Sequence, residues 1–209
     1  MAYNILTINP GSTSTKVALF RDMEQVKTLT LRHSAEEIAR FASVADQLDW
    51  RLEIILDALK ADGIKLEELD AVIGRGGLMR PIEGGVYRVG EAMMADLKAP
   101  KRQHASNLGA LIARRIADVA GVEAYIADPV VVDELQDMAR VSGLKECPRR
   151  SIFHALNQKA IARRYAKEVG RPYEDLNLVV VHMGGGISVS AHCKGRVIDT
   201  NNALDGDGP

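Results

Sequence analysis

Two stretches of sequence decide the fold, INPGSTSTK at residues 8–16 and VHMGGGISV at residues 181–189. Each opens at the end of a run of strand-forming residues, continues into a polar or glycine-rich turn, and leads at once into further strand-forming residues. Short runs of this composition on either side of a turn predict β-hairpins. The sequence therefore predicts two strand–turn–strand segments, one near its beginning and one near its end.

Working outward from these turns, the pattern of apolar residues predicts a third strand after each hairpin. Each segment then holds three consecutive strands, within residues 5–31 and within residues 178–200. Two further short apolar runs, at residues 71–73 and 123–127, also predict strands. The repetition of one pattern indicates two related domains.

Helices are predicted between the two segments. Ser34 and Glu37 form a capping-box pattern that predicts the start of a short helix. Three longer helices are predicted from apolar residues at helical spacing, namely Leu48, Leu52, Ile55, Leu56 and Leu59, then Leu108, Ile112, Ile116 and Val119, and finally Ile161, Tyr165 and Val169. Strands that alternate with helices after a hairpin-rich start predict a mixed sheet flanked by helices, an α/β fold.

The boundary between the two domains is predicted near residues 143–150, where Pro148 interrupts regular structure. The chain then divides into domains at 1–148 and 149–209. The last five residues, 205–209, have the composition of a loop rather than of a helix or strand end. This composition suggests that the chain is truncated within its second domain.

Composition excludes several classes of protein. The 27 lysines and arginines balance 28 acids, so a net charge of -1 gives no support to a nucleic-acid or membrane partner. The two cysteines, Cys147 and Cys193, lack CxxC spacing, which argues against a disulfide framework or a zinc ribbon and fits a reducing cytoplasm. The sequence starts without a secretory pattern, and no apolar run approaches the length of a membrane span.

The first candidate for chemistry is the turn that joins the first two predicted strands. Its hydroxyls and backbone N–H groups are suited to hold phosphate oxygens, and Lys16 is suited to neutralise their charge. The plainer interpretation is a polar hairpin loop, and the two are evenly matched on composition alone. The turn is not a Walker A loop, because the GxxxxGK[ST] spacing is absent.

The second candidate is the turn that follows His182, with Gly184, Gly185 and Gly186 ahead of Ser188. Three glycines allow a backbone to approach a phosphate closely. Glycine-rich turns are often no more than tight hairpins, so this signal is weak by itself. It is stronger beside the first turn, because two matched loops suit the clamping of a nucleotide's phosphates.

An arginine among glycines is the third candidate. Arg75 lies in the segment Gly74–Gly77, where it is suited to bidentate binding of a carboxylate or phosphate. The alternative is a loop arginine in a surface ion pair, and Arg80 is a nearby competitor for the same role.

Three histidines form the fourth candidate group. His104, His154 and His182 each stand where a strand or loop meets a turn, and their spacing fits no zinc motif. A lone histidine is usually structural or at the surface, and the alternative for these three is a role as donors to a phosphoryl group, whereas His33 and His192 have no such context. Asp128, which precedes Pro129 at a predicted strand end, is suited to orient a metal-bound water or a histidine, or simply to form the turn.

Taken together, these segments resemble the acetate kinase family of carboxylate kinases. The resemblance runs in order over essentially the whole chain, and GRGG with DPVVVDE favours the branch that acts on butyrate. The matching stretches are INPGSTSTK (8–16), GRGGLMRPIEGG (74–85), HASNLGALIA (104–113), DPVVVDE (128–134), SIFHALNQKA (151–160), VHMGGGISV (181–189) and DTNNALDGDGP (199–209). It implies the actin-like, ribonuclease H-like ATPase fold of sugar kinases and heat-shock chaperones, in which two domains close over a cleft. Family members continue beyond the last residue of this chain, so the second domain is expected to be incomplete.

The resemblance also implies roles for individual residues. Asn9, Ser12, Ser14 and Lys16 are expected at the phosphate end of the nucleotide site, where the glycine-rich turn from Gly184 to Ser188 is the matching loop. His154 and His182 are expected to contact the transferred phosphoryl group, and Asp128 matches an acid tied to magnesium or to the geometry of the site. His104 matches a histidine near the substrate, and Phe153 is placed at the wall of the alkyl pocket. Arg75 matches the carboxylate-binding arginine, with a shorter gap before the following Gly-Gly than acetate kinases have.

The implied reaction is reversible transfer of a phosphoryl group between ATP and a short-chain fatty acid, with Mg²⁺, in a protein expected to be a homo-oligomer. The acceptor is a carboxylate with a pKa of about 4, already ionised near neutral pH, so no strong general base is required. Catalysis then depends on alignment and charge neutralisation, which suits cations, donors and glycines. The alternative is an actin-like or chaperone-like ATPase that switches a protein partner, and Arg75 and His104 discriminate because such a switch binds no carboxylic acid.

Overall fold

The computed structural model describes residues 2–99 and 102–204. The chain forms two compact units, the first from Met1–Met79 and Val86–Ala127 and the second from Arg80–Gly85 and Asp128–Pro209. The change of unit thus falls between residues 127 and 128, where Asp128 takes a left-handed φ of 37°. The predicted boundary between folding domains, near residue 148, remains a prediction.

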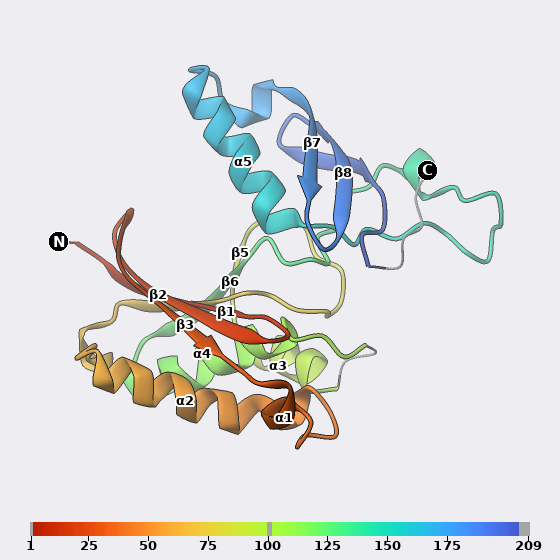
Figure 1. Ribbon diagram of the computed structural model, residues 1–209. Helices are drawn as coiled ribbons and strands as arrows, with labels where there is room; N and C mark the ends of the chain where they lie inside the picture. Colours follow the sequence, from red (N-terminus) through yellow and green to blue (C-terminus); the bar gives the residue numbers. More distant parts are fainter. Residues whose placement is uncertain (1, 100–101, 205–209) are drawn as a thin grey trace. The chain divides into compact units, whose positions relative to one another are not determined.

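The first unit is built on a six-stranded mixed sheet (Figure 1). Its order is β3-β2-β1-β4-β6-β5, with β1 parallel to β4 and β4 parallel to β6, and with antiparallel pairing elsewhere. The strands are β1 (Asn4–Pro10), β2 (Ser14–Arg21), β3 (Glu24–Arg32), β4 (Ala71–Gly74), β5 (Val86–Arg88) and β6 (Glu123–Ala127). The mixed sheet and the opening three-strand meander confirm the prediction from sequence, whereas β5 was not predicted.

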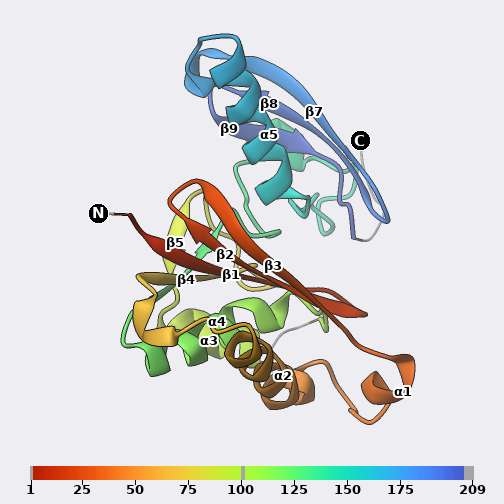
Figure 2. The ribbon, with the colours of Figure 1, turned by 60° about the vertical axis from the view of Figure 1, so that its left-hand side comes forward.

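Three helices lie on the same face of this sheet in both ribbon views (Figures 1 and 2). They are α2 (Leu48–Ala61), α3 (Glu91–Lys98) and α4 (Asn107–Ala120), and α3 was not predicted. The shorter elements are α1 (Ala35–Ile38), which Ser34 and Glu37 cap as expected, and the 3-10 helices Ala45–Gln47 and Leu66–Glu68. Fully buried side chains of α4, such as Leu108 and Ile112, join strand residues such as Leu6 in one core. This core fixes the strand ends that carry the first candidate residues.

The second unit contains a three-stranded antiparallel sheet and one long helix. The elements are β7 (Asn177–Met183), β8 (Ile187–Cys193), β9 (Arg196–Thr200), α5 (Ala155–Glu168) and the 3-10 helices Asp137–Arg140 and Tyr173–Asp175. The sheet confirms the second predicted meander. Ala162 and Ala166 of α5 pack with Tyr173 and Leu176, against Leu178 and Val180 of β7.

The apolar residues that predicted α5 do not form its buried face. The apolar stripe of Ile161, Tyr165 and Val169 is 43–48% exposed, and the buried face instead carries alanines together with Gln158 and Lys159. The small alanines let the helix approach the sheet closely, and the polar residues find buried partners. The helical periodicity therefore located the helix but not its core face.

Residues 80–85 belong to the second unit because specific contacts hold them there. Ile82 forms a parallel bridge with Val132, and the N–H of Gly84 donates to the Glu134 carboxylate over 2.9 Å. Glu134 also forms a buried ion pair with Lys159. A Cβ on Gly84 would lie 2.5 Å from the Lys159 ammonium, so a larger residue here would have to displace a member of this buried pair. Throughout residues 2–99 and 102–204, no helix has the length and apolar character required to cross a membrane.

Candidate active site

The turn between β1 and β2 is tight and open to solvent. The N–H of Gly11 donates to the carbonyl of Ser14 over 2.7 Å, and Asn9 pairs with Lys16 across the hairpin. Asn9, Ser12 and Lys16 are exposed, and Ser14 is half-buried. The side chains expected at the phosphates are therefore gathered on one accessible hairpin end.

A buried arginine that sequence reasoning missed supports this turn from below. Arg51 of α2 is 1% exposed and donates to the carbonyls of Gly11 and Ser12, over 2.8 and 3.3 Å, and to Thr15 Oγ1 over 3.1 Å. Gln47 Oε1 accepts from the same guanidinium over 3.0 and 2.8 Å. Burial lowers the pKa of Arg51, but arginine starts so high that it stays charged. A fixed positive charge thus lies directly beneath the candidate phosphate loop.

His33 completes the polar group under the turn. One of its ring nitrogens, Nε2, lies 2.9 Å from Thr15 Oγ1, and its ring packs in a tilted contact on Trp50. Burial and the nearby charge of Arg51 lower the pKa of His33, which favours the neutral ring. From the sequence alone, His33 has no functional context. In the structure it contacts Thr15, the residue that follows Ser14 of the turn.

Close glycine contacts position the segment that carries Arg75. A Cβ on Gly74 would lie 2.2 Å from the carbonyl oxygen of Gly109, and a Cβ on Gly77 would lie 2.5 Å from Asn107. The Asn107 amide oxygen accepts from the N–H of Leu78 over 2.8 Å. The GRGG segment is thereby pressed against the N-terminal turn of α4, and larger residues at these points would push it away.

Arg75 and His104 lie together beside the turn between β1 and β2. The backbone N–H of Arg75 extends the pairing of β4 with β1, and its guanidinium donates to Asn9 Oδ1 over 3.3 Å. Burial and the charge of Arg75 lower the pKa of His104, so its ring is neutral near pH 7. Its Nδ1 accepts from the N–H of Ser106 over 3.2 Å, which leaves the ring proton on Nε2. The first unit therefore brings a cation and a neutral donor to the carboxyl ends of two parallel strands, where α/β folds bind ligands.

The second unit gathers the other two predicted histidines. The rings of His154 and His182 stack with centroids 3.7 Å apart and an interplanar angle of 8°. Nδ1 of His182 lies 2.9 Å from the amide nitrogen of Asn157, and Nδ1 of His154 lies 2.9 Å from Ser188 Oγ. A Cβ on Gly186 would approach His154 Cε1 to 3.1 Å, so this glycine leaves room for the ring. The imidazoles, the glycine turn and Ser188 thus form one cluster at the end of the β7–β8 hairpin.

The contacts of Asp128 and Phe153 are with other groups of the protein itself, so both residues have structural roles that the sequence did not indicate. The carboxylate of Asp128 is buried and accepts from the N–H of Gly85 over 2.8 Å and from Arg163 over 2.7 Å. Phe153 is fully buried in a small core with Val132 and Val197. Among the residues that the structure describes, no group of three or more His, Cys, Asp or Glu side chains is arranged to hold a metal ion.

Known proteins share both sequence and fold with this chain. Residues 138–205 match the model of the acetokinase family. Over 209 residues the chain is 56% identical to butyrate kinase 2 of Clostridium acetobutylicum, and over 208 residues it is 59% identical to butyrate kinase 1 of the same organism. These alignments cover 100% and 99% of this chain but 59% of each relative, so the chain spans about three-fifths of the length of the curated proteins it matches.

Solved structures show the same fold at low sequence identity. The acetate kinase of Porphyromonas gingivalis aligns with a TM-score of 0.69 at 18% identity, over 96% of this chain and 57% of that one. A propionate kinase from Francisella tularensis aligns with a TM-score of 0.66 at 17% identity, over 97% of this chain and 58% of that one. The expected actin-like α/β fold is therefore confirmed. Over its full length this chain is therefore a homologue of the butyrate kinases, and residues 138–205 match the acetokinase family.

Proposed function

We propose that the protein transfers a phosphoryl group reversibly between ATP and a short-chain fatty acid such as butyrate. The observation that carries this proposal is the placement of Arg75 beside His104 and Asn9, next to the solvent-open turn of Ser12 and Ser14. A guanidinium matches the geometry of a carboxylate, and a neutral imidazole donor adds a hydrogen bond without a second charge. A nucleotide switch that acts on a protein partner needs no such carboxylate-binding group.

The residues divide the work according to their chemistry. Arg75 and His104 bind and orient the acid, whose ionised carboxylate needs no base. Ser12, Ser14, Lys16 and the glycines from Gly184 to Gly186 hold phosphate oxygens, with Arg51 adding fixed positive charge beneath the first turn. The hydroxyl of Ser188, which was expected there too, is buried against His154 and Gln158 instead. His154 and His182 donate to the transferred group, where the negative charge is spread in the transition state.

Magnesium enters this proposal through the nucleotide. Mg²⁺ is usually held by substrate phosphates and only one or two carboxylates, and it would neutralise phosphate charge. Asp128 is the carboxylate that the family resemblance offers, but both of its oxygens already accept hydrogen bonds from Gly85 and Arg163. We therefore assign Asp128 to the geometry of the site, the second of the two roles that the resemblance left open. We also propose that the protein acts in the cytoplasm and forms a homo-oligomer.

Formation of an acyl phosphate tests this function. Protein expressed from the complete gene is incubated with ATP, magnesium and butyrate, and hydroxylamine traps the product as a hydroxamate. We expect hydroxamate and ADP in equal amounts, both dependent on the acid. ADP release that is independent of any carboxylic acid would instead support an ATPase switch and would overturn the proposal.

A further inference from the structure

A continuous series of hydrogen bonds runs through the interior of the second unit and ends at His154. The distances between successive polar atoms are 2.6 Å from the Tyr173 hydroxyl to His192 Nδ1, 3.0 Å from His192 Nε2 to Gln158 Oε1, 2.8 Å from Gln158 Nε2 to Ser188 Oγ, and 2.9 Å from Ser188 Oγ to His154 Nδ1. We call Tyr173, His192, Gln158 and Ser188 the histidine-orienting chain. All four side chains are at most 4% exposed.

One backbone carbonyl fixes the direction of the first two bonds. Gln158 Nε2 lies 3.1 Å from the carbonyl oxygen of Ser188, which can only accept, so the amide nitrogen must face Ser188. The amide oxygen then faces His192, and because it too can only accept, the proton of His192 lies on Nε2. Nδ1 of a neutral His192 accepts, and the Tyr173 hydroxyl donates to it.

The electrostatics of His192 agree with this direction. Burial and the nearby charge of Lys159 lower the pKa of His192 to about 4, so the ring is neutral near pH 7. Burial also raises the pKa of Tyr173, which keeps its hydroxyl protonated and able to donate. Every bond in the series therefore has one donor and one acceptor.

The last bond sets the state of His154. Ser188 Oγ receives the Gln158 amide over 2.8 Å and the backbone N–H of His154 over 3.4 Å, and these donors occupy its two lone pairs. The hydroxyl proton must then point to His154 Nδ1. A proton on Nδ1 would clash with this hydroxyl proton, so Nδ1 accepts the hydrogen bond and the ring proton of His154 lies on Nε2.

We propose that the histidine-orienting chain is a set of positioning residues that holds the His154 imidazole in one plane with its proton on Nε2. The stacked ring of His182 fixes the same plane from one side. This inference rests on the proposed function only in its purpose, which is to direct the Nε2–H donor at a phosphoryl oxygen. The tautomer itself is a property of the folded protein and can be measured without substrate.

The tautomer is measured by NMR of the protein with ¹⁵N-labelled histidine near neutral pH. The His154 signals are assigned from the spectrum of His154→Gln. Protonated and unprotonated ring nitrogens differ widely in ¹⁵N shift, and we expect Nδ1 of His154 unprotonated and Nε2 protonated. A wild-type spectrum with the proton of His154 on Nδ1 would overturn the proposal without any variant.

Ser188→Ala and Ser190→Ala are a matched pair of variants. Both serines are buried on the same face of β8. Ser190 Oγ, however, forms a hydrogen bond with Thr200 Oγ1 and is not part of the histidine-orienting chain. Ser188→Ala should shift the ring nitrogens of His154 toward a mixture of tautomers, whereas Ser190→Ala should leave them unchanged. Equal effects of the two variants would reduce Ser188 to a packing role and contradict the proposal.

A second pair of variants tests Tyr173, the residue of the histidine-orienting chain that is farthest from His154. Tyr173→Phe deletes the donor to His192 but keeps the ring, and Tyr165→Phe makes the same change on the exposed face of α5. In the hydroxamate assay, Tyr173→Phe and Ser188→Ala should lower kcat on the order of tenfold, the worth of one hydrogen bond, with little change in the KM for ATP. If His154 has the expected tautomer but the protein forms no acyl phosphate, the proposed function is contradicted and the positioning role is not. A kcat unchanged in both variants, with activity present, would contradict the positioning role.

Discussion

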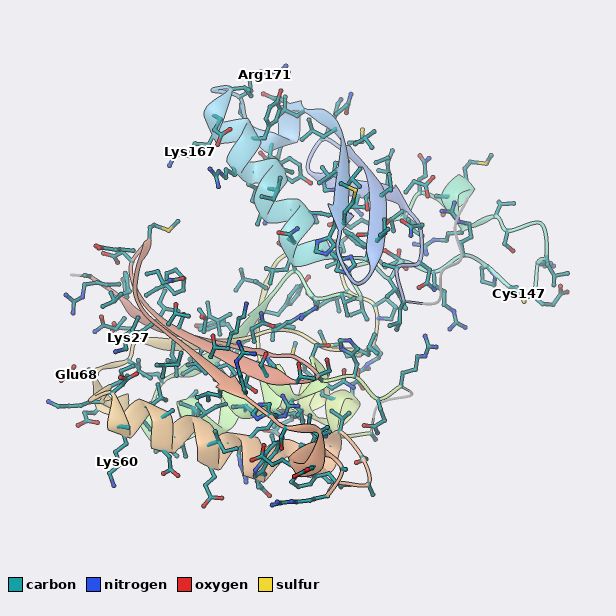
Figure 3. The ribbon with its side chains drawn as sticks, viewed as in Figure 1. Lys27, Lys60, Glu68, Cys147, Lys167 and Arg171 are labelled. Atoms are coloured by element: carbon teal, nitrogen blue, oxygen red, sulfur yellow. The ribbon has the colours of Figure 1, made fainter. Side chains whose placement is uncertain are left out.

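The imidazole rings of His154 and His182 lie face to face, 3.7 Å between centroids, on two different elements of the second unit. His154 precedes the first residue of α5, and His182 lies in β7. Lys167, labelled in Figure 3, lies in the last turn of the same helix, where the helix dipole favours a cationic side chain. The stack therefore restrains the plane of both rings.

His154→Ala and His182→Ala should each lower kcat more than they raise the KM for ATP. The reason is that donors to the transferred group act most strongly in the transition state. Loss of one such donor costs about a hundredfold to a thousandfold in kcat. The double variant should lose less than the product of the two single losses, because each ring helps to hold the other. Steady-state hydroxamate kinetics provide the measurement, and an effect confined to the KM for ATP would show that the rings only bind nucleotide.

Arg75→Lys should weaken binding of the acid. A point charge replaces a planar fork, and the lost interaction is about 1.5–3 kcal/mol. The KM for butyrate should rise while the KM for ATP changes little. Arg88→Lys is the matched control, since Arg88 is an exposed strand arginine paired with Glu123. If Arg75→Lys has the kinetics of the wild type, the carboxylate-binding role passes to Arg80.

Arg51→Met should destabilise the first unit and loosen the turn between β1 and β2. The substitution keeps apolar bulk but removes the donors to Gly11, Ser12 and Thr15. Charged hydrogen bonds of this kind contribute about 1.5–3 kcal/mol each at most, and buried acceptors are left without partners. Urea unfolding should show a loss of about 2–4 kcal/mol, and amide exchange should accelerate at residues 11–15.

The control for this prediction is Arg115→Met. Arg115 is an exposed arginine of α4 that pairs with Asp49, an interaction of small worth at the surface. It should unfold within about 0.5 kcal/mol of the wild type. Equal losses for the two variants would show that Arg51 contributes no more than a surface ion pair.

Much of the fold was predictable because hairpin turns and apolar alternation are local signals. Both meanders, the mixed sheet and the Ser34 cap were confirmed. The short strand β5 and helix α3 were missed. Three strand residues and a weakly amphipathic helix of eight residues carry little periodic signal.

The buried polar residues were not predictable from the rule that apolar side chains face inward. On β8 the rule is reversed, since Ser188, Ser190 and His192 are buried while Ile187 and Val189 are 56% and 45% exposed. These polar side chains are buried because they find hydrogen-bond partners far away in sequence, as Ser188 does in Gln158. Arg51 did leave a signal, because it shares the helical stripe of Ile55 and Leu59. An arginine on the buried stripe of a helix needs buried acceptors, which could have pointed to the turn.

Gly109→Ala should disturb the position of Arg75. The new Cβ would lie 2.2 Å from the carbonyl oxygen of Arg75, a backbone atom that cannot rotate away. Overpacking of this kind costs about 1–3 kcal/mol or more. Thermal unfolding and the KM for butyrate should both change. Gly90→Ala is the control, because Gly90 has a negative φ and open space around its Cβ position. An unchanged unfolding temperature and KM in Gly109→Ala would contradict the close packing of β4 on α4.

The buried ring of His192 should make stability depend on pH. Its pKa falls from 6.5 to about 4 on folding, mainly because of burial, so between these values the unfolded chain binds a proton that the native protein does not. Stability is therefore full above pH 6.5 and is lost as the pH falls toward 4. The loss amounts to about 3 kcal/mol at most. His33 and His104 also have lowered pKa values and act in the same direction, so the wild type alone cannot isolate His192.

His192→Gln isolates the contribution of this residue. A glutamine amide offers one donor and one acceptor to Gln158 and Tyr173 but does not titrate in this range. Urea unfolding of both proteins near pH 7 and near pH 4.5 should show a smaller loss of stability on acidification in the variant, by about 2–3 kcal/mol. His33 and His104 are present in both proteins, so their contributions cancel in the comparison. Parallel stability curves for the two proteins would mean that His192 is not held neutral in the folded state, and the assigned direction of the hydrogen bonds from Tyr173 to His154 would lose its electrostatic support.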